Sequence, residues 1–216
     1  MTPKQNKTTK QSLRKLNHAL HWVKDGMRLL AIEPDEAKIR LHAEQIAAWY
    51  NDPHNHEMMT GLARHEDFDV IEFVTDLQKA GGHYFLLFCD GQLVGDGDFR
   101  NIKQDRAEFT LMIGGSEFKG KGLGTAFTTL LHAFAFDVLD LSAAYLTTVF
   151  QNEVALRCYA KVGYVRVDRL PEPDPDGQED DIPMVLHRDA FRNRHHERFC
   201  KSVVDGTEGH SYLGDE

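Results

Sequence analysis

The sequence predicts a mixed α/β (α+β) fold in which a twisted, mostly antiparallel mixed sheet of six to seven strands carries helices on both faces. Three short apolar runs, 84–89, 92–99 and 107–113, follow one another with connections of hairpin length, which is typical of an antiparallel meander. The chain then changes to β-α-β-α-β order, which indicates strands that share a sheet with helices on both faces. A glycine-rich segment joins these two halves.

Apolar runs and helical periodicity divide the chain into elements. We expect strands over 27–32, 84–89, 92–99, 107–113, 144–150, 164–170 and 182–187, and helices over 35–50, 67–79, 122–139 and 153–161. Leu13, Leu16, Leu20 and Val23 recur at helical spacing, so a further short helix is expected to lead toward Gly26. From about residue 192 the chain is polar and is expected to form a helix or a tail.

Composition indicates one globular domain with extensions at both ends. Of 216 residues, 41% are hydrophobic, which is enough to bury a sizeable core. Residues 1–26 hold six Lys or Arg side chains against one acid, and we interpret them as a basic N-terminal extension, partly disordered or helical. The domain itself is expected over 27–188, followed by a polar C-terminal tail over 189–216.

Charge and cysteine content exclude several function classes. The net charge is −9 despite the basic first 26 residues, so the acidic body disfavours nucleic acid as a partner. No apolar run reaches the roughly 18 residues that span a membrane, and the cytoplasm is the expected compartment. Cys89, Cys158 and Cys200 are widely spaced without a CxxC pair, so we expect reduced thiols and neither a disulfide framework nor a zinc ribbon.

The segment from Gly114 to Thr125 reads GGSEFKGKGLGT and precedes a predicted helix. Glycines lack Cβ atoms, so backbone N–H groups can converge on an anion at the positive end of the helix. A Walker A loop is disfavoured because Gly122 stands where a Ser or Thr would bind magnesium. The dinucleotide fingerprint GxGxxG fails as well, because Thr125 or Phe127 would have to be a glycine or another small residue. The segment therefore predicts a phosphate cradle of another geometry.

Two motifs together resemble the GNAT superfamily of N-acetyltransferases. Its signature, Gln/Arg-x-x-Gly-x-Gly/Ala, is filled by Lys119, Gly122 and Gly124, with lysine in place of the usual Gln or Arg. A second segment, running from Asn152 to Tyr164, is similar to the N-x-x-A-x-x-x-Y-x-K-x-G-F/Y pattern of the RimJ/RimL-like and spermidine-acetylating branches. The resemblance covers about residues 27–188.

The resemblance implies that acetyl-CoA is the co-substrate and that no metal takes part. It implies pyrophosphate binding at Lys119, Gly120, Lys121, Gly122, Leu123 and Gly124, pantetheine binding along Leu111, Met112 and Ile113, and a cofactor contact from Asn152. Asn152 also suits the N-cap of its helix, and both roles stay open. Backbone donors near Met112 and Ile113 would polarise the thioester carbonyl.

The resemblance also suggests two catalytic side chains. Tyr159 is expected to protonate the departing thiolate, since a thiol has a pKa of about 8.5 and a tyrosine about 10; the alternative is a packed aromatic whose hydroxyl only orients the sulfur. An ammonium of pKa about 10.4 is almost fully protonated at pH 7, so a base should assist the acceptor. Glu108 is the candidate base, although a strand glutamate can equally be structural.

The acceptor is left open between a small polycationic amine and a protein N-terminal amine. The loop 171–181 holds six acids, which would attract a polycation, although a solvated loop explains them equally well. His54, His56 and Glu57 could line the acceptor pocket, but they lack a third ligand for a metal site, and solvated loop residues explain them better. The oligomeric state is open, a homodimer included. The alternative function is a non-catalytic acyl-CoA-binding or sensor module.

Overall fold

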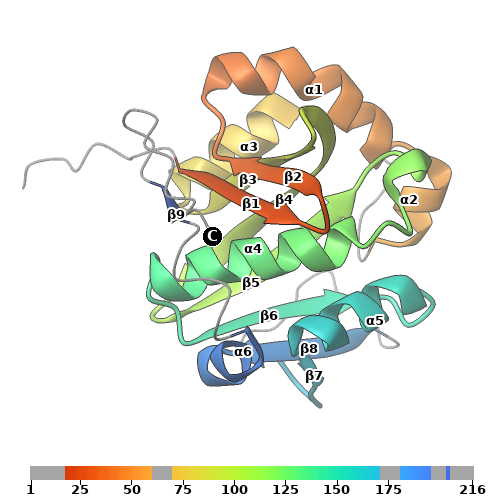
Figure 1. The fold of residues 1–216 in the computed structure, drawn as a ribbon. Helices are drawn as coiled ribbons and strands as arrows, with labels where there is room; N and C mark the ends of the chain where they lie inside the picture. The colour runs from red at the N-terminus through yellow and green to blue at the C-terminus, as the bar shows by residue number, and fades with distance from the viewer. Residues whose placement is uncertain (1–17, 60–69, 171–180, 196–202, 205–216) are drawn as a thin grey trace, which may run out of the picture.

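The computed structural model describes residues 18–59, 70–170, 181–195 and 203–204 (Figure 1). Along the chain lie β1 (Ala19–Lys24), β2 (Met27–Ile32), α1 (Glu36–Tyr50), α2 (Pro53–Glu57), α3 (Val70–Lys79), β3 (His83–Cys89), β4 (Gln92–Lys103), β5 (Arg106–Ile113), a 3₁₀ turn (Ser116–Phe118), α4 (Leu123–Asp137), β6 (Ala143–Thr148), α5 (Glu153–Val162), β7 (Val165–Arg166), β8 (Ile182–His187), α6 (Arg188–His195) and β9 (Val203–Val204). No helix within these ranges is long and apolar enough to cross a membrane.

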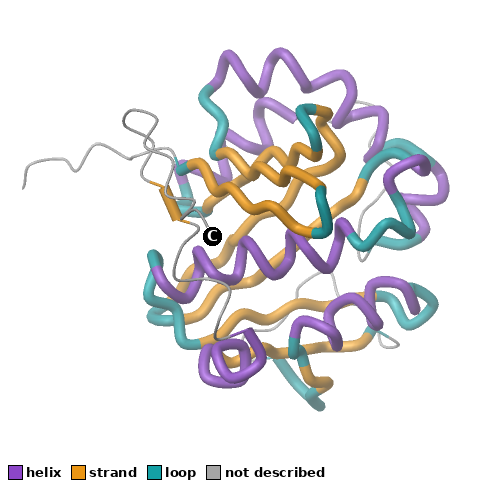
Figure 2. The backbone as a smooth tube through the Cα atoms, in the orientation of Figure 1, coloured by secondary structure: helices purple, strands orange, loops and turns teal. Residues whose placement is uncertain are grey.

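One mixed sheet runs through the domain in the order β7-β8-β6-β5-β4-β3-β2-β1-β9. Strands β1 to β5 form an antiparallel meander, and β5 pairs in parallel with β6. The mixed, mostly antiparallel sheet is therefore confirmed. The predicted number of strands is too low, because the described residues form nine: β1 and β9 extend the sheet at one edge, next to β2. Figure 2 shows the strands and the helices that cover them.

Helices cover both faces of the sheet, as predicted, and each face has its own core. Tyr84 and Leu86 of β3 pack with α1 and α3, whereas Phe85 and Leu87 pack with α4. This alternation explains why β3 is one continuous apolar run, since a strand covered on both faces has no solvent side. Helix α4 is the centre of the larger core, and its Phe127 and Phe134 are fully buried.

The helix expected to lead toward Gly26 is wrong over residues 19–24, which form β1. Residues 12–17 of that prediction lie outside the described part of the chain. The deciding local signal is Asp25-Gly26, where both residues have positive φ angles of 51° and 80° and close a two-residue hairpin between Lys24 and Met27. Leu20 and Val23 do not share a buried helical face, because Leu20 is fully buried while Val23 is 51% exposed.

The remaining differences from the predicted elements are shifts of boundary. The strand expected over 164–170 is reduced to Val165–Arg166, and the helix at the C-terminal side begins at Arg188, directly after β8. Phe191 anchors this helix in the larger core. The polar tail expected over 189–216 therefore begins as a packed helix, and Val203–Val204 pair with β1 as β9. The rest of that tail, like the acidic loop over 171–180, lies outside the described ranges.

Three side chains tie together the ends of the first three strands. The Glu33 carboxylate contacts the Nδ1 atom of His18 at 2.6 Å and that of His83 at 2.5 Å, and it also accepts the backbone N–H of His18 at 2.9 Å. Among the described residues this is one trio with the geometry to surround a metal ion, but its donor atoms are already engaged with one another. Burial alone would raise the pKa of Glu33, but the hydrogen bonds from both histidines lower it to about 2.

Replacing Glu33 by glutamine is expected to lower the free energy of unfolding by about 2 kcal/mol at pH 7, because hydrogen bonds to a buried carboxylate are lost. A depressed folded-state pKa stabilises above the unfolded value of 4.5, and this contribution disappears as the pH falls toward 2. Urea unfolding should therefore show the difference shrinking between pH 5 and pH 2. The exposed Glu44→Gln is the control, and an equal effect of both variants would contradict this role.

Candidate active site

Strands β5 and β6 pair over only part of their length. Their parallel pairing covers Arg106↔Ala143, Ala107↔Ala144 and Glu108↔Tyr145 and goes no further among the described residues, although β5 continues to Ile113 and β6 to Thr148. The opposite edge of β5 stays paired with β4 up to Ile113. Leu111, Met112 and Ile113 therefore present an unpaired strand edge toward β6, as a pantetheine-binding strand requires.

The glycine-rich segment begins where β5 ends and packs tightly against α1. A Cβ atom on Gly114 would lie 1.9 Å from the Trp49 ring, so only glycine fits there. Gly120 and Gly122 have positive φ angles of 74° and 80°, and Gly122 is the N-cap of α4 with no side chain that caps the helix. The first N–H groups of this 15-residue helix thus lack a side-chain cap beside two left-handed glycines, which suits an anion.

The two lysines of this segment have different surroundings. Lys121 is exposed, whereas Lys119 is half-buried and its ammonium donates to the side-chain oxygen of Asn55 in α2. Burial lowers the pKa of Lys119. Asn55 is buried and also donates to the backbone oxygens of Trp49 and Gly114, at 2.9 and 3.2 Å. Lys119 is therefore part of the scaffold that fixes the loop, and Asn55 is a positioning residue that sequence reasoning missed.

Asn152 is the N-cap of α5. Its Oδ1 accepts the N–H of Ala155 at 3.0 Å, and its Nδ2 donates to the Met58 backbone oxygen at 3.2 Å. The structural role left open by the sequence is therefore confirmed. The helix places Asn152, Ala155 and Tyr159 along one side, and all three line the same cavity.

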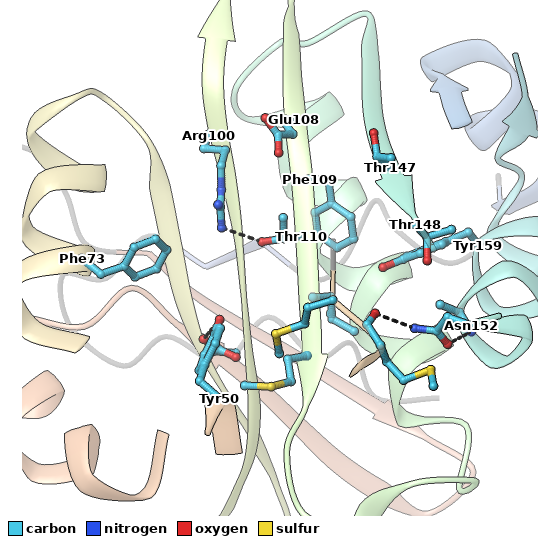
Figure 3. Close-up of a pocket in the computed structure, with 16 residues that line it drawn as sticks. Tyr50, Phe73, Arg100, Glu108, Phe109, Thr110, Thr147, Thr148, Asn152 and Tyr159 are labelled. Atoms are coloured by element: carbon cyan, nitrogen blue, oxygen red, sulfur yellow. Dashed lines mark hydrogen bonds between the residues drawn. The ribbon is translucent and has the colours of Figure 1, made fainter. Parts of the chain in front are cut away.

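A cavity of about 220 Å³ lies where α1, α3, β4, β5, β6 and α5 meet (Figure 3). It is lined by Tyr50, Met58, Met59, Phe73, Asp96, Arg100, Glu108, Phe109, Thr110, Leu111, Met112, Thr147, Thr148, Asn152, Ala155 and Tyr159. Both predicted catalytic residues, Tyr159 and Glu108, are brought to this one cavity, together with Leu111 and Met112. Ile113 and the glycine-rich segment lie outside its lining.

Three cross-strand pairs of β4 and β5 form the floor of the cavity, and all of their residues except Asp98 line it. Arg100 faces Glu108, Asp98 faces Thr110, and Asp96 faces Met112, all on the side of the sheet toward α1 and α3. Arg100 binds both oxygens of the buried Asp98, at 2.7 Å from Nε and 2.5 Å from Nη2, and its guanidinium stacks 5.3 Å from the Phe73 ring. Asn101 donates to Glu108 at 2.7 Å.

Asp96 is the most unusual group in the cavity. It is 1% exposed, its Oδ2 accepts the hydroxyls of Tyr50 at 2.9 Å and Tyr84 at 2.8 Å, and its Oδ1 has no hydrogen-bond partner among the described residues. Burial raises the pKa of Asp96 to about 7 against the lowering effect of the two tyrosines. Sequence reasoning missed it, although two aspartates two residues apart inside an otherwise apolar strand are a usable signal, because residues i and i+2 share a face.

Tyr159 is 8% exposed, and its ring packs against Phe109 and Tyr164 with centroids 6.5 and 5.5 Å away. No described residue hydrogen-bonds its hydroxyl, which leaves that group available to a ligand in the cavity. Burial, followed by the nearby Cys158, raises the pKa of Tyr159 above its ordinary value. The shift moves its pKa away from that of a thiol.

Comparison with known proteins agrees with this geometry. The profile of the acetyltransferase (GNAT) domain family matches residues 28–165, more than half of the chain. This chain belongs to the GNAT acetyltransferase family. The resemblance inferred from the two motifs is confirmed, and the family match begins one residue inside β2 and ends at β7.

Curated relatives match parts of this GNAT chain. Spermidine N(1)-acetyltransferase of Escherichia coli K12 is 37% identical over 82 residues, which are 37% of this chain and 44% of that protein. Acetyltransferase PseH of Campylobacter jejuni is 30% identical over 116 residues, 53% of this chain and 71% of that protein. The chain thus matches less than half the length of the spermidine enzyme.

Solved structures share the GNAT fold at low sequence identity. Aminoglycoside acetyltransferase AAC(6')-Ib, in complex with coenzyme A and kanamycin, has a TM-score of 0.62 at 21% identity, covering 76% of this chain and 98% of that one. Spermidine N-acetyltransferase from Vibrio cholerae, in complex with CoA and spermine, has a TM-score of 0.62 at 20% identity, with 76% and 97% covered.

Other predicted residues of the GNAT site lie elsewhere. His54, His56 and Glu57 form part of α2 and do not line the cavity; the same segment contributes Met58 and Met59 instead. A role of these three residues in acceptor binding stays a prediction, and the exposure of His54 and Glu57 agrees with solvated side chains. Leu123 is 2% exposed, so its side chain belongs to the core and only its backbone can meet a ligand.

Proposed function

We propose that this protein transfers an acetyl group from acetyl-CoA directly to a primary amine, through a tetrahedral intermediate and without a covalent enzyme species. The observation that carries the proposal is the unpaired edge of β5, which borders the cavity at Leu111 and Met112 and leads directly along the chain into the glycine-rich segment before α4. A long ligand with an extended arm and a pyrophosphate at its far end fits such a path. Acetyl-CoA has this shape.

In this proposal the donor is held chiefly by backbone groups. The pyrophosphate meets the N–H groups from Lys119 to Gly124, with Lys121 supplying an exposed positive charge. The pantetheine arm follows the open edge of β5 at Leu111, Met112 and Ile113. Asn152, held at its N-cap, stands beside the arm, and Tyr159 on the next turns of the same helix reaches the sulfur.

For the acceptor we propose a small, slender primary amine in preference to a protein N-terminus. The cavity is about 220 Å³, and Met58, Met59, Phe73 and Met112 give it apolar walls that suit an aliphatic stem. The acids on its floor outnumber the single arginine, which favours a cation. The names of the relatives that act on spermidine and on aminoglycosides support an amine acceptor. We expect the reaction in the cytoplasm.

A non-catalytic acyl-CoA-binding module is the second candidate. It would need the cradle but no group near the sulfur, whereas here the Tyr159 hydroxyl lines the cavity.

The test is release of free CoA from acetyl-CoA across a panel of alkyl diamines, polyamines, aminoglycosides and N-terminal peptides. We expect release with slender amines, and stabilisation against heat by acetyl-CoA but not by ATP. Thermal stabilisation by acetyl-CoA without CoA release for any amine would favour the non-catalytic module, and stabilisation by ATP alone would remove both candidates.

A further inference from the structure

The buried carboxylate of Asp96 is only partly hydrogen-bonded. Its Oδ1 is buried in the cavity wall with no partner among the described residues, while Oδ2 already holds the Tyr50 and Tyr84 hydroxyls. A buried carboxylate oxygen without a partner costs free energy, so such atoms are uncommon unless a ligand completes them. The cavity supplies the space for that ligand.

No neighbouring cation satisfies this carboxylate. Arg100 is engaged with both oxygens of Asp98 and faces Glu108, so the cavity lining holds two acids, Asp96 and Glu108, and one arginine that is already paired. The groups that face Asp96 are Tyr50 from α1, Tyr84 from β3, and Asp98 and Arg100 from β4. A cationic ligand would supply the missing partner of Oδ1 and offset the acidic excess of this lining.

Asp96 lies on the sheet beside the strand edge where we propose that acetyl-CoA binds. Asp96 pairs with Met112 across β4 and β5, and Met112 is on the strand edge proposed to hold the thioester. Glu108 lies four cross-strand pairs away, opposite Arg100, and its carboxylate accepts a hydrogen bond from Asn101. Of the two acids that line the cavity, Asp96 is thus closer along the sheet to the thioester position.

We infer that Asp96 receives the acceptor: its Oδ1 binds the ammonium group and takes one proton from it before the amine attacks the thioester. This inference rests on the proposed function. One N–H bond breaks, one O–H bond forms on Oδ1, and the nitrogen keeps the electron pair with which it attacks the carbonyl carbon. A carboxyl group with a pKa of about 7 accepts this proton more readily than one at the usual 3.8. Glu108 then has no part in this first transfer.

The decisive variant is Asp96→Asn, which keeps the shape and an acceptor for the tyrosine hydroxyls. We expect the amine KM to rise at least tenfold, kcat to fall, and the dissociation constant for CoA to change less than twofold. In the wild type, kcat/KM for the amine should fall as the pH drops below about 7, because Asp96 becomes protonated. The variant should lose that decline. Asp76→Asn, on the exposed surface of α3, is the matched control.

The variant Tyr50→Phe provides a second test of the role of Asp96, in which the carboxylate is kept. It deletes one hydroxyl donor to Oδ2, which should raise the pKa of Asp96 and shift the decline in kcat/KM to higher pH. An active wild type whose Asp96→Asn variant keeps its amine KM and its pH profile would overturn the inference and leave the proposed function standing. If Asp96→Asn does not fold, an unshifted profile in Tyr50→Phe overturns it. Absence of CoA release from the wild type with every amine overturns both.

Discussion

Replacing Tyr159 by phenylalanine is expected to lower kcat by about 10²–10⁴-fold while acetyl-CoA still binds, because the variant loses the hydroxyl that protonates the leaving sulfur. The side chain is buried in the wall of the cavity, so the ring of phenylalanine keeps the packing against Phe109 and Tyr164. Single-turnover CoA release and calorimetric titration with CoA measure the two quantities separately.

The size of this effect also distinguishes the two roles open to Tyr159. Burial raises its pKa, which makes full proton transfer to a thiolate harder than the unperturbed values of about 10 and 8.5 indicate. A hydroxyl that only orients the sulfur would give a loss below tenfold, and unchanged turnover would remove Tyr159 from the mechanism. Tyr164→Phe is the control, since its hydroxyl hydrogen-bonds the buried His132 at 2.7 Å, and it should lower stability without comparable loss of kcat.

Replacing Gly122 by valine is expected to weaken acetyl-CoA binding at least tenfold, about 1.4 kcal/mol. Gly122 has a φ of 80°, which a β-branched residue adopts only with strain, so the loop must change shape and its N–H groups must leave the phosphate position. Direct contacts are not the cause, because a Cβ at this position would meet nothing within 4 Å. Calorimetry with CoA measures the loss.

The matched control is Gly81→Val in the turn between α3 and β3. Gly81 has a φ of 88° and the same open surroundings, but it precedes the start of β3, whereas the charge of Lys121 acts on Cys89 at the other end of that strand. Gly81→Val and Gly122→Val should lose a similar amount of stability, and only Gly122→Val should lose affinity for CoA. Equal loss of affinity in both, or none in Gly122→Val, would contradict the proposed role of the cradle.

The parts of the fold that sequence predicted are those with strong local signals. Residues 92–99 and 107–113 alternate or run apolar between clear turns, and the glycines from 120 to 124 mark the start of α4. Strand β1 was missed because Leu16, Leu20 and Val23 match a helical period. Residues 19–24 form a strand because the Asp25-Gly26 turn folds them back onto β2, with which they pair. Tertiary pairing outweighed local periodicity there.

Residues of the candidate site that belong to sequence motifs were predicted. Residues that reach the site only through the packing of separate helices and strands were missed. Tyr159 and Glu108 meet in one cavity as expected. The contact of Asp96 with Tyr50 joins residues 46 positions apart, and that of Lys119 with Asn55 joins residues 64 apart. No spacing rule predicts such pairs, because they depend on how α1 and α2 pack against the sheet.

The most direct test of direct acetyl transfer is a single turnover with isotopically labelled acetyl-CoA and a slender diamine, followed by mass spectrometry of the protein and of the small molecules. We predict that the label passes to one amine nitrogen of the diamine and that no labelled protein forms at any time. A labelled enzyme that appears before the product, for example with acetyl on Cys158 beside Tyr159, would contradict direct transfer.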